Sequence, residues 1–246
     1  MYPKERRDAI LEILKKQGYA TVEDIISKLH YSSATINRDL NILQKQNLVK
    51  RSYGGVEPVK AHGIPLPYRY DKMKVEKRHI GREAAHLVED GDTIFIDATT
   101  TTQSMAQYLT EKNNITVITN NMALAIYLSN YGIKVIVLGG EIIESPNFTG
   151  GFDAAEIAQK YHADKLFFST GGITNDGRIC SSYSDVLRVM LRNSDKAYCL
   201  VDHEKIGVDA KEYAFDFSKI TGVISDADIS HFKESYPDTG FIRARV

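Results

Sequence analysis

Short, almost continuously apolar runs recur through residues 74–246, and helix-like stretches separate them. The runs are TIFID (93–97), ITVIT (115–119), IKVIVLGG (133–140), KLFFST (165–170), AYCLVD (197–202) and GVIS (222–225). A strand that is apolar on both sides is typical of a parallel sheet with helices packed on both faces. This alternation predicts a doubly wound α/β domain.

Polar residues and glycines follow the ends of these runs. The carboxyl ends of parallel strands share one edge, and ligands of such sheets bind beyond that edge, so we expect one ligand-binding rim. The candidate effector-binding residues are Asp97, Thr99, Thr100, Thr101, Thr102, Asn120, Gly139, Gly140, Gly171 and Lys205.

Four consecutive threonines after the first run indicate the chemistry of the ligand. Threonine hydroxyls and the free N–H groups of a starting helix can hold a phosphate, and Lys205 can supply an opposing charge. The chain has neither GxGxxG nor GxxxxGK[ST], which disfavours a dinucleotide or a P-loop nucleotide. We therefore expect a phosphorylated small molecule, such as a sugar phosphate, as the ligand, and no cofactor. The alternative is that Thr99 only caps a helix while its neighbours pack beneath a loop.

The first sixty residues differ from the rest in charge and in periodicity. They carry eleven Lys and Arg against seven Asp and Glu, whereas residues 61–246 carry twenty against twenty-five. Apolar residues recur at helical spacing in three short blocks, within 10–14, 22–29 and 36–43. Thr21 and Asp24 form a capping-box pattern for the second block, and Ser32 or Ser33 can cap the third. A basic segment of short helices favours binding to nucleic acid.

The tight turn between the second and third blocks predicts a helix-turn-helix, with SSATINRDLNILQKQ (32–46) as recognition helix. In NLVKRSYGGVEPV (47–59) a glycine pair joins two extended runs, which predicts a β-hairpin wing. Outward polar side chains on the helix can read bases, and basic wing residues can bind phosphates. The alternative is a solvated surface on which Arg38 pairs with Asp39 or Glu23. The candidate DNA-binding residues are Ser33, Thr35, Asn37, Arg38, Lys50, Arg51 and Tyr53.

These patterns predict a winged helix-turn-helix domain (1–57), a proline-containing linker (58–73) and an α/β sensor domain (74–246). No apolar run has the length of a membrane span and the N-terminus lacks a signal-peptide pattern, so we expect a cytoplasmic protein with no membrane partner.

Cys180 and Cys199 lack a CxxC pattern and are expected to be reduced packing thiols. The histidines show no metal-ligand spacing, so we expect no metal.

Residues 6–56, from RRDAILEILKK to RSYGGV, resemble the N-terminal domain of the DeoR family of bacterial transcriptional regulators. Asn37 replaces the first arginine of the family's recognition-helix motif, and Tyr53 replaces a frequent histidine. Residues 74–246 resemble the family's C-terminal sensor domain, which is similar in fold to ribose-5-phosphate isomerase. The family's D-S-G-T-T-T loop matches 97–102, with Thr99 in place of glycine. Its T-N pair, its two glycine segments and its D-x-x-K-x-G motif match 119–120, 138–140, 171–173 and 202–207.

The resemblance implies a repressor of a sugar-catabolism operon that releases its operator when a phosphorylated sugar binds, and that has no catalytic residues. Because one recognition helix covers few base pairs, we expect a homodimer or higher homo-oligomer on double-stranded DNA. The alternative is an aldose-ketose isomerase with a fused head, in which Asp97, Asp153 or Glu141 moves protons and Lys205 stabilises the enediolate. Candidate interface aromatics are Tyr127, Tyr131, Tyr161 and Tyr183.

Overall fold

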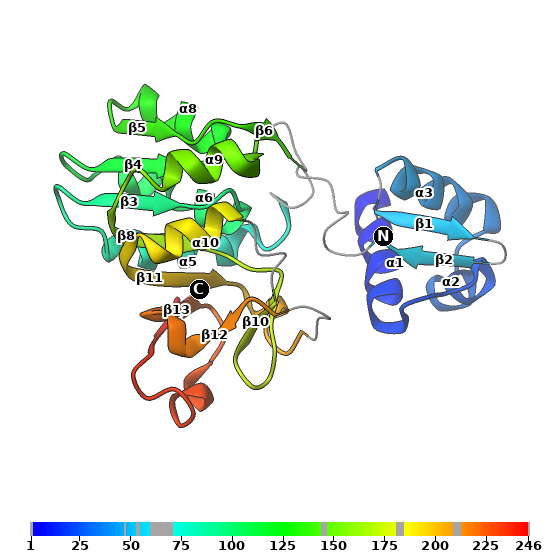
Figure 1. Ribbon diagram of the computed structural model, residues 1–246. Coiled ribbons are helices and arrows are strands. Elements are labelled where there is room, and N and C mark those ends of the chain that lie inside the picture. The colour runs from blue at the N-terminus through cyan, green and yellow to red at the C-terminus, as the bar shows by residue number, and fades with distance from the viewer. Residues whose placement is uncertain are drawn as a thin grey trace. The chain divides into compact units, whose positions relative to one another are not determined.

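The computed structural model describes residues 2–46, 48–52, 55–59, 71–143, 147–180, 185–208 and 213–245. The chain forms two compact units, Met1–Arg69 and Tyr70–Val246, which are drawn in Figure 1. Most of the expected linker, residues 60–70, lies outside the described residues, as do Tyr53 and Tyr183. Within the described part of the chain, no helix has both the length and the apolar character needed to cross a membrane.

The N-terminal unit is a three-helix head with a two-stranded wing. Its helices are α1 (Pro3–Gln17), α2 (Val22–Leu29) and α3 (Ser33–Lys45), and the wing is an antiparallel pair of β1 (Val49–Ser52) and β2 (Gly55–Pro58). The apolar residues of the three blocks meet in one core with the wing, where Ile10, Ile25, Leu40 and Val56 are fully buried. The expected winged helix-turn-helix is confirmed.

Side-chain caps fix the starts of the two helices that form the helix-turn-helix. Thr21 accepts from the N–H of Asp24, whose carboxylate in turn accepts from the N–H of Thr21, and the pair begins α2 as expected. Ser32 accepts from the N–H of Thr35 and begins α3. Between them His30 takes the left-handed conformation, with φ of 57°. The tight turn therefore has a defined geometry, and it fixes α3 relative to α2.

The C-terminal unit is built on a parallel sheet of seven strands in the order β14-β13-β11-β8-β3-β4-β5. All six neighbouring pairs run parallel, so every strand ends at the same edge. The expected doubly wound fold is confirmed, and β14 adds a strand that the apolar pattern did not predict. The bounds are β3 (Thr93–Ile96), β4 (Thr116–Thr119), β5 (Lys134–Val137), β8 (Ala163–Phe168), β11 (Ser194–Val201), β13 (Gly222–Ser225) and β14 (Gly240–Arg243).

Helices cover both faces of this sheet. On one face α5 (Lys74–His86), α7 (Ala106–Leu109) and α8 (Met122–Asn130) bury Ile80, Leu109 and Leu128. On the other face lie α9 (Gly151–Ala158) and α10 (Asp185–Arg192), which are drawn in front of the sheet in Figure 1. Two buried clusters result, one on each side of the strands.

Shorter elements lie between the strands of the large sheet along the chain. After β3 the chain forms two short helices, α6 (Thr100–Gln103) and α7. A strand pair joins β6 (Glu141–Ile142) to β7 (Thr149–Gly150), and a small antiparallel sheet joins β12 (Phe215–Asp216), β10 (Arg178–Cys180) and β9 (Gly172–Ile173). Three short 3-10 helices follow the later strands: η2 (His203–Lys205), η3 (Phe217–Lys219) and η4 (Ser230–Lys233).

The order of the strands contains one switch point. From β3 the chain adds β4 and then β5 on one side, after which it returns and adds β8, β11, β13 and β14 on the other side. The switch therefore lies between β3 and β8. In sheets of this class the crevice outside the strand ends at such a point is where ligands bind.

Candidate functional site

The outer side of α3 carries the residues expected to contact DNA. Ser33 and Arg38 are exposed and Thr35 and Asn37 are half-buried, whereas Ile36 is fully buried beneath them. Arg38 makes no hydrogen bond or ion pair with any other residue in the described part of the chain. It therefore does not pair with Asp39 or Glu23, which was the alternative for this helix.

Asp39 instead connects α3 to α1. It is 1% exposed, and Arg6 Nε donates to its Oδ2 at 2.5 Å while Arg7 Nη1 lies 3.6 Å from Oδ1. The Arg6 guanidinium also lies over the ring of Tyr31, 4.8 Å from the centroid. A buried carboxylate between two arginines holds the recognition helix in register against the rest of the head.

The wing arginine lies against the recognition helix. Arg51 Nη2 donates to Asn37 Oδ1 and Arg51 Nη1 donates to Asn41 Oδ1, each at 2.8 Å. Asn37 Nδ2 in turn donates to the carbonyl oxygen and the hydroxyl of Ser33, at 2.9 and 3.2 Å. The structure thus joins three of the expected wing and helix residues, Arg51, Asn37 and Ser33, and it adds Asn41. The neighbouring Lys50 is exposed and lies 3.8 Å from Glu57.

In the C-terminal unit, Asp97 lies at the switch point. Its Oδ2 accepts from the N–H of Ser169, which follows β8, and its Oδ1 accepts from the hydroxyls of Thr99 and Thr102 at 2.9 and 2.7 Å. Asp97 is 7% exposed, and burial raises the pKa of its carboxyl although these hydrogen bonds act to lower it. The carboxylate connects the end of β3 to the end of β8.

The four threonines have different partners. Thr99 begins α6 as its cap and shares Asp97 with Thr102, while the hydroxyl of Thr100 accepts from Lys77 Nζ at 3.1 Å. Thr101 is fully buried, and its hydroxyl has no hydrogen-bond partner within the described residues. Thr99 has φ of −105°, an extended value that a β-branched residue adopts without strain. The replacement of the family's loop glycine therefore requires no strained backbone here.

Asn120 follows β4, the other neighbour of β3. It is 8% exposed; its Nδ2 donates to the carbonyl of Thr149 at 2.9 Å, and its Oδ1 is buried with no partner in the part of the chain that the structure describes. Asn121, the next residue, caps α8 by accepting from the N–H of Leu124. The side-chain oxygens of the two adjacent asparagines thus differ. Oδ1 of Asn121 caps a helix, whereas Oδ1 of Asn120 remains available to accept a hydrogen bond from a ligand.

The remaining rim residues lie on both sides of this centre. Lys205 Nζ donates to the carbonyl of Thr170 at 2.6 Å and lies 3.5 Å from the hydroxyl of Ser169, beside the exposed Gly171. Gly139 and Gly140 follow the edge strand β5. A Cβ on Gly140 would lie 2.4 Å from the carbonyl oxygen of Gly150, at a φ of +104°, so Gly140 has a structural reason to be glycine.

Lys77 was not among the residues selected from the sequence. It is 6% exposed on α5 and donates to Thr100, while its carbonyl accepts from the hydroxyl of Ser104 at 2.5 Å. A signal existed, because Lys77 shares the buried face of α5 with Ile80, Gly81 and Ala84, and lysine on an apolar stripe is unusual. Lys77 brings a buried cation to the threonine run.

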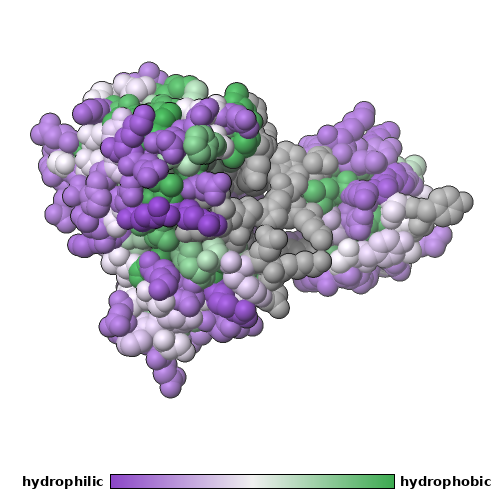
Figure 2. Space-filling view, in the orientation of Figure 1, coloured by the Kyte–Doolittle hydropathy of each residue, from purple (hydrophilic) through white to green (hydrophobic). Residues whose placement is uncertain are grey.

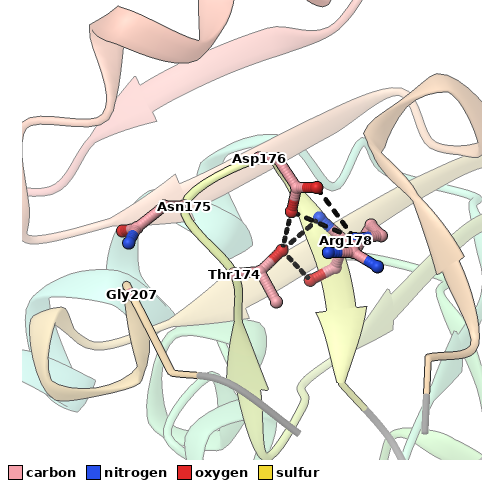
Figure 3. Close-up of a pocket in the computed structure, with 5 residues that line it drawn as sticks. All are labelled: Thr174, Asn175, Asp176, Arg178 and Gly207. Carbon is pink, nitrogen blue, oxygen red and sulfur yellow. Dashed lines mark hydrogen bonds and ion pairs between the residues drawn. The ribbon is translucent and has the colours of Figure 1, made fainter. Parts of the chain in front are cut away.

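A separate pocket of about 360 Å³ opens beside the β9–β10 hairpin, lined by Thr174, Asn175, Asp176, Arg178 and Gly207 (Figure 3). Arg178 Nε lies 2.9 Å from Asp176 Oδ2, and the hydroxyl of Thr174 bonds the same carboxylate. None of the residues expected to bind the effector lines this pocket. Its polar groups mainly bond one another, so the switch point between β3 and β8 remains the better candidate site.

Comparisons with known proteins agree in both units. The model of the DeoR-like helix-turn-helix domain matches residues 6–61, and that of the DeoR C terminal sensor domain matches residues 72–227. The HTH-type transcriptional repressor GlcR of Bacillus subtilis (strain 168) is 35% identical over 231 residues, covering 92% of this chain and 89% of the relative. The glycerol-3-phosphate regulon repressor of Escherichia coli (strain K12) is 31% identical over 232 residues, 92% of each. A solved ribose 5-phosphate isomerase A from Methanocaldococcus jannaschii is 16% identical, with a TM-score of 0.42 over 55% of each chain.

Proposed function

This chain belongs to the DeoR family of transcriptional regulators, and from that premise we propose that it represses a sugar-catabolism operon and leaves its operator when a phosphorylated sugar binds. Both relatives described above are named repressors, and one is named for the regulon of a phosphorylated three-carbon compound. Those names support repression rather than activation, and they support a phosphorylated compound as the effector.

The head would supply the DNA contacts. Ser33, Thr35 and Arg38 on the outer side of α3 are proposed to face base edges in the major groove, with Asn37 beside them. Lys50, Arg51 and Tyr53 of the wing are proposed to contact the DNA beside the helix. A symmetric pair of heads would cover the two halves of an operator, so we propose at least a dimer, acting in the cytoplasm where its DNA lies.

The effector site is supported chiefly by two buried oxygens, Thr101 Oγ1 and Asn120 Oδ1, which have no hydrogen-bond partner within the described residues. They follow β3 and β4, which are adjacent strands beside the switch point. A buried polar atom without a partner costs about 1–3 kcal/mol, so a ligand that supplies hydrogen bonds gains from both. Asn120 Oδ1 can accept from a sugar hydroxyl, and Thr101 can donate to a phosphate oxygen.

The charge around the site also fits a phosphate. Lys77 of α5 lies beside the threonine run and Lys205 of η2 beside Ser169, so two cations from different elements flank the switch point. We propose that these lysines, Thr100 and Thr101 hold the phosphate end, while the hydroxyls of Thr99 and Thr102 hold Asp97 beside it. Asp97, Asn120, Gly139, Gly140 and Gly171 are proposed to line the remainder, with no cofactor.

The isomerase alternative is not favoured. The chain belongs to a family of DNA-binding regulators, and it is a regulator rather than an enzyme. Of the carboxylates considered as proton carriers, Glu141 and Asp153 are exposed on β6 and α9. The carboxylate of Asp97 accepts hydrogen bonds from Thr99, Thr102 and Ser169, and in this way it joins two strand ends.

The test is a titration of labelled duplex from upstream of the chain's own operon at fixed salt. Triose, pentose and hexose phosphates are then added, with the matching unphosphorylated sugars as controls. We expect binding about a thousandfold tighter than to random DNA, and a weakening of about tenfold or more by one phosphate and not by its parent sugar. Equal affinity for the operon duplex and for random DNA would refute the proposed repressor function. If no sugar phosphate of the panel weakened binding, the proposed class of effector would be refuted.

A further inference from the structure

We propose that Arg51 of the wing reads a base pair in the major groove, and that Asn37 and Asn41 of α3 position its guanidinium for that purpose. This inference rests on the proposed function, because it requires a specific DNA site. Its basis is the pair of 2.8 Å hydrogen bonds from Nη1 and Nη2 of Arg51 to the two asparagine amides.

The geometry brings the arginine onto the recognition helix. Side chains alternate along a strand, so Arg51 shares the face of β1 that carries the buried Val49, while Lys50 lies on the opposite face. Asn37 and Asn41 are one helical turn apart and therefore lie on the same side of α3. Since the guanidinium bonds both, it lies along the outer side of the helix rather than beyond the wing.

The partners of Arg51 leave its charge available. Arg6 is bonded to a carboxylate, Asp39, and Lys50 lies near Glu57, so both of those cations face an anion. Arg51 is held by neutral amides, which fix its position without compensating its charge, and within the described residues it makes no ion pair. Its other N–H donors remain available, and a planar guanidinium matches O6 and N7 of guanine with two parallel bonds.

The same contacts make Asn37 a positioning residue. Reading adenine would require its Oδ1 and its Nδ2 together, but Oδ1 accepts from Arg51 and Nδ2 donates to Ser33. Both contacts of Nδ2 go to Ser33, so bidentate reading by Asn37 would break at least one of them. Arg38 and Arg51 are then the base-reading cations on this surface.

The test is selection from a pool of randomised duplexes, comparing the unaltered chain with Arg51→Lys and Lys50→Met. Arg51→Lys keeps the charge but loses the planar fork, so we expect it to lose preference at one base pair of each half-site and about tenfold or more in affinity for the parent site. Lys50→Met, the adjacent control, should enrich the parent sequence and bind all duplexes more weakly, with a salt slope lower by about one.

Two further variants test the positioning role. Asn41→Ala should broaden preference at the same base pair as Arg51→Lys, and the double variant should broaden it no further, because both changes disable one reader. Thermal unfolding of each variant is the control that checks whether the head remains folded. Preference lost at a different base pair, or additive losses, would show that Asn41 reads its own base and would overturn the assignment.

The two proposals fail in distinguishable ways. If Arg51→Lys enriches the parent sequence unchanged while the unaltered chain enriches a defined site, Arg51 is a phosphate contact and this inference is wrong, although the repressor remains. If the unaltered chain enriches no sequence, the proposed function fails and the inference fails with it.

Discussion

At the scale of single residues, four identical side chains in sequence have four separate environments. Thr99 and Thr102 bond Asp97, Thr100 accepts from Lys77, and Thr101 is buried without a partner within the described residues. The hydroxyls that bond Asp97 support the connection between β3 and β8. The hydroxyl without a partner costs stability, and a site that tolerates this cost is a candidate for ligand binding.

Replacing Thr101 by valine tests whether its hydroxyl serves ligand binding rather than the stability of the fold. The change replaces the hydroxyl by a methyl group of similar size, so we expect stability to be unchanged or raised by up to about 1 kcal/mol. At the same time the concentration of sugar phosphate that releases operator DNA should rise by about tenfold. Urea unfolding and the DNA titration measure the two effects.

Thr102→Val is the matched control for that experiment. It removes a bond to the buried Asp97, and we expect it to destabilise the C-terminal unit by about 1–3 kcal/mol. If Thr101→Val destabilised the chain as much as Thr102→Val, the Thr101 hydroxyl would have a structural partner and the effector site would lose its main support.

A histidine beside the rim gives stability a dependence on pH. His203 Nδ1 lies 2.5 Å from Asp226 Oδ2, and this hydrogen bond raises the pKa of His203 against the opposing effect of partial burial. Folding then favours the protonated ring. The stabilisation is complete below the unfolded-state pKa of about 6.5 and is lost as pH rises through the higher folded-state value.

We therefore expect His203→Gln to lower the urea midpoint at pH 6 and to have little effect at pH 9. The exposed His231→Gln serves as control and should leave the pH profile of the unaltered chain in place. A difference between the unaltered chain and His203→Gln that grew with pH would contradict the assigned direction.

At the scale of elements, the glycine pair after β5 shows how one loop position differs from its neighbour. A Cβ on Gly140 would meet the carbonyl oxygen of Gly150, whereas a Cβ on Gly139 would lie 3.6 Å from the nearest atom, Ile157 Cδ1. We expect Gly140→Ala to destabilise the C-terminal unit by about 1–3 kcal/mol and Gly139→Ala to change it by less than about 1 kcal/mol. Thermal unfolding of both variants measures this, and equal effects would mean that the positive φ of Gly140 is not required.

The fold could be predicted at the level of element types. Continuous apolar runs identify buried parallel strands, and caps at Thr21 and Ser32 identify helix starts, because both signals are local. The β9, β10 and β12 strands and β14 could not be predicted. They are two to four residues long, and their pairing depends on distant segments rather than on periodicity.

The partners within the sites were less predictable than the residues. The candidate rim residues were predicted because they follow strands, but nothing local indicates that Asp97 bonds Ser169, which lies 72 positions away. Arg51 and Asn41 are likewise joined across a turn of the chain. A sequence shows which polar groups are present, whereas the register between elements decides which of them are already paired.

At the scale of the whole molecule, assembly is a proposal, and an exposed apolar region of the C-terminal unit is the candidate surface for it. The edge strand β5 and its neighbours expose large apolar side chains, and Figure 2 shows hydrophobic residues at the surface near α8 and β6. Of the aromatics considered for an interface, Tyr131 is 60% exposed and its ring lies 5.0 Å from that of Tyr127. The exposed side chains in this region are Ile126, Tyr131, Val137, Ile142 and Phe152.

We expect the unaltered chain to sediment as a dimer or larger, and Ile126→Ser combined with Tyr131→Ser to raise the dissociation constant about tenfold or more. Val75→Ser, an exposed apolar residue on α5, is the control and should not change the mass. A double variant that sediments like the unaltered chain would place the interface on another surface.

The bonds between Arg51 and the two asparagines of α3 bear on how such proteins could be redesigned. Exchanging residues 33–45 with those of a relative would move Asn37 and Asn41 and leave the arginine behind on its own hairpin. A transplanted helix would then carry only part of its DNA preference. The smallest portable unit for altering the target of this protein is therefore residues 33–58, helix and wing together, and substitutions at 37, 41 and 51 should be chosen as a set.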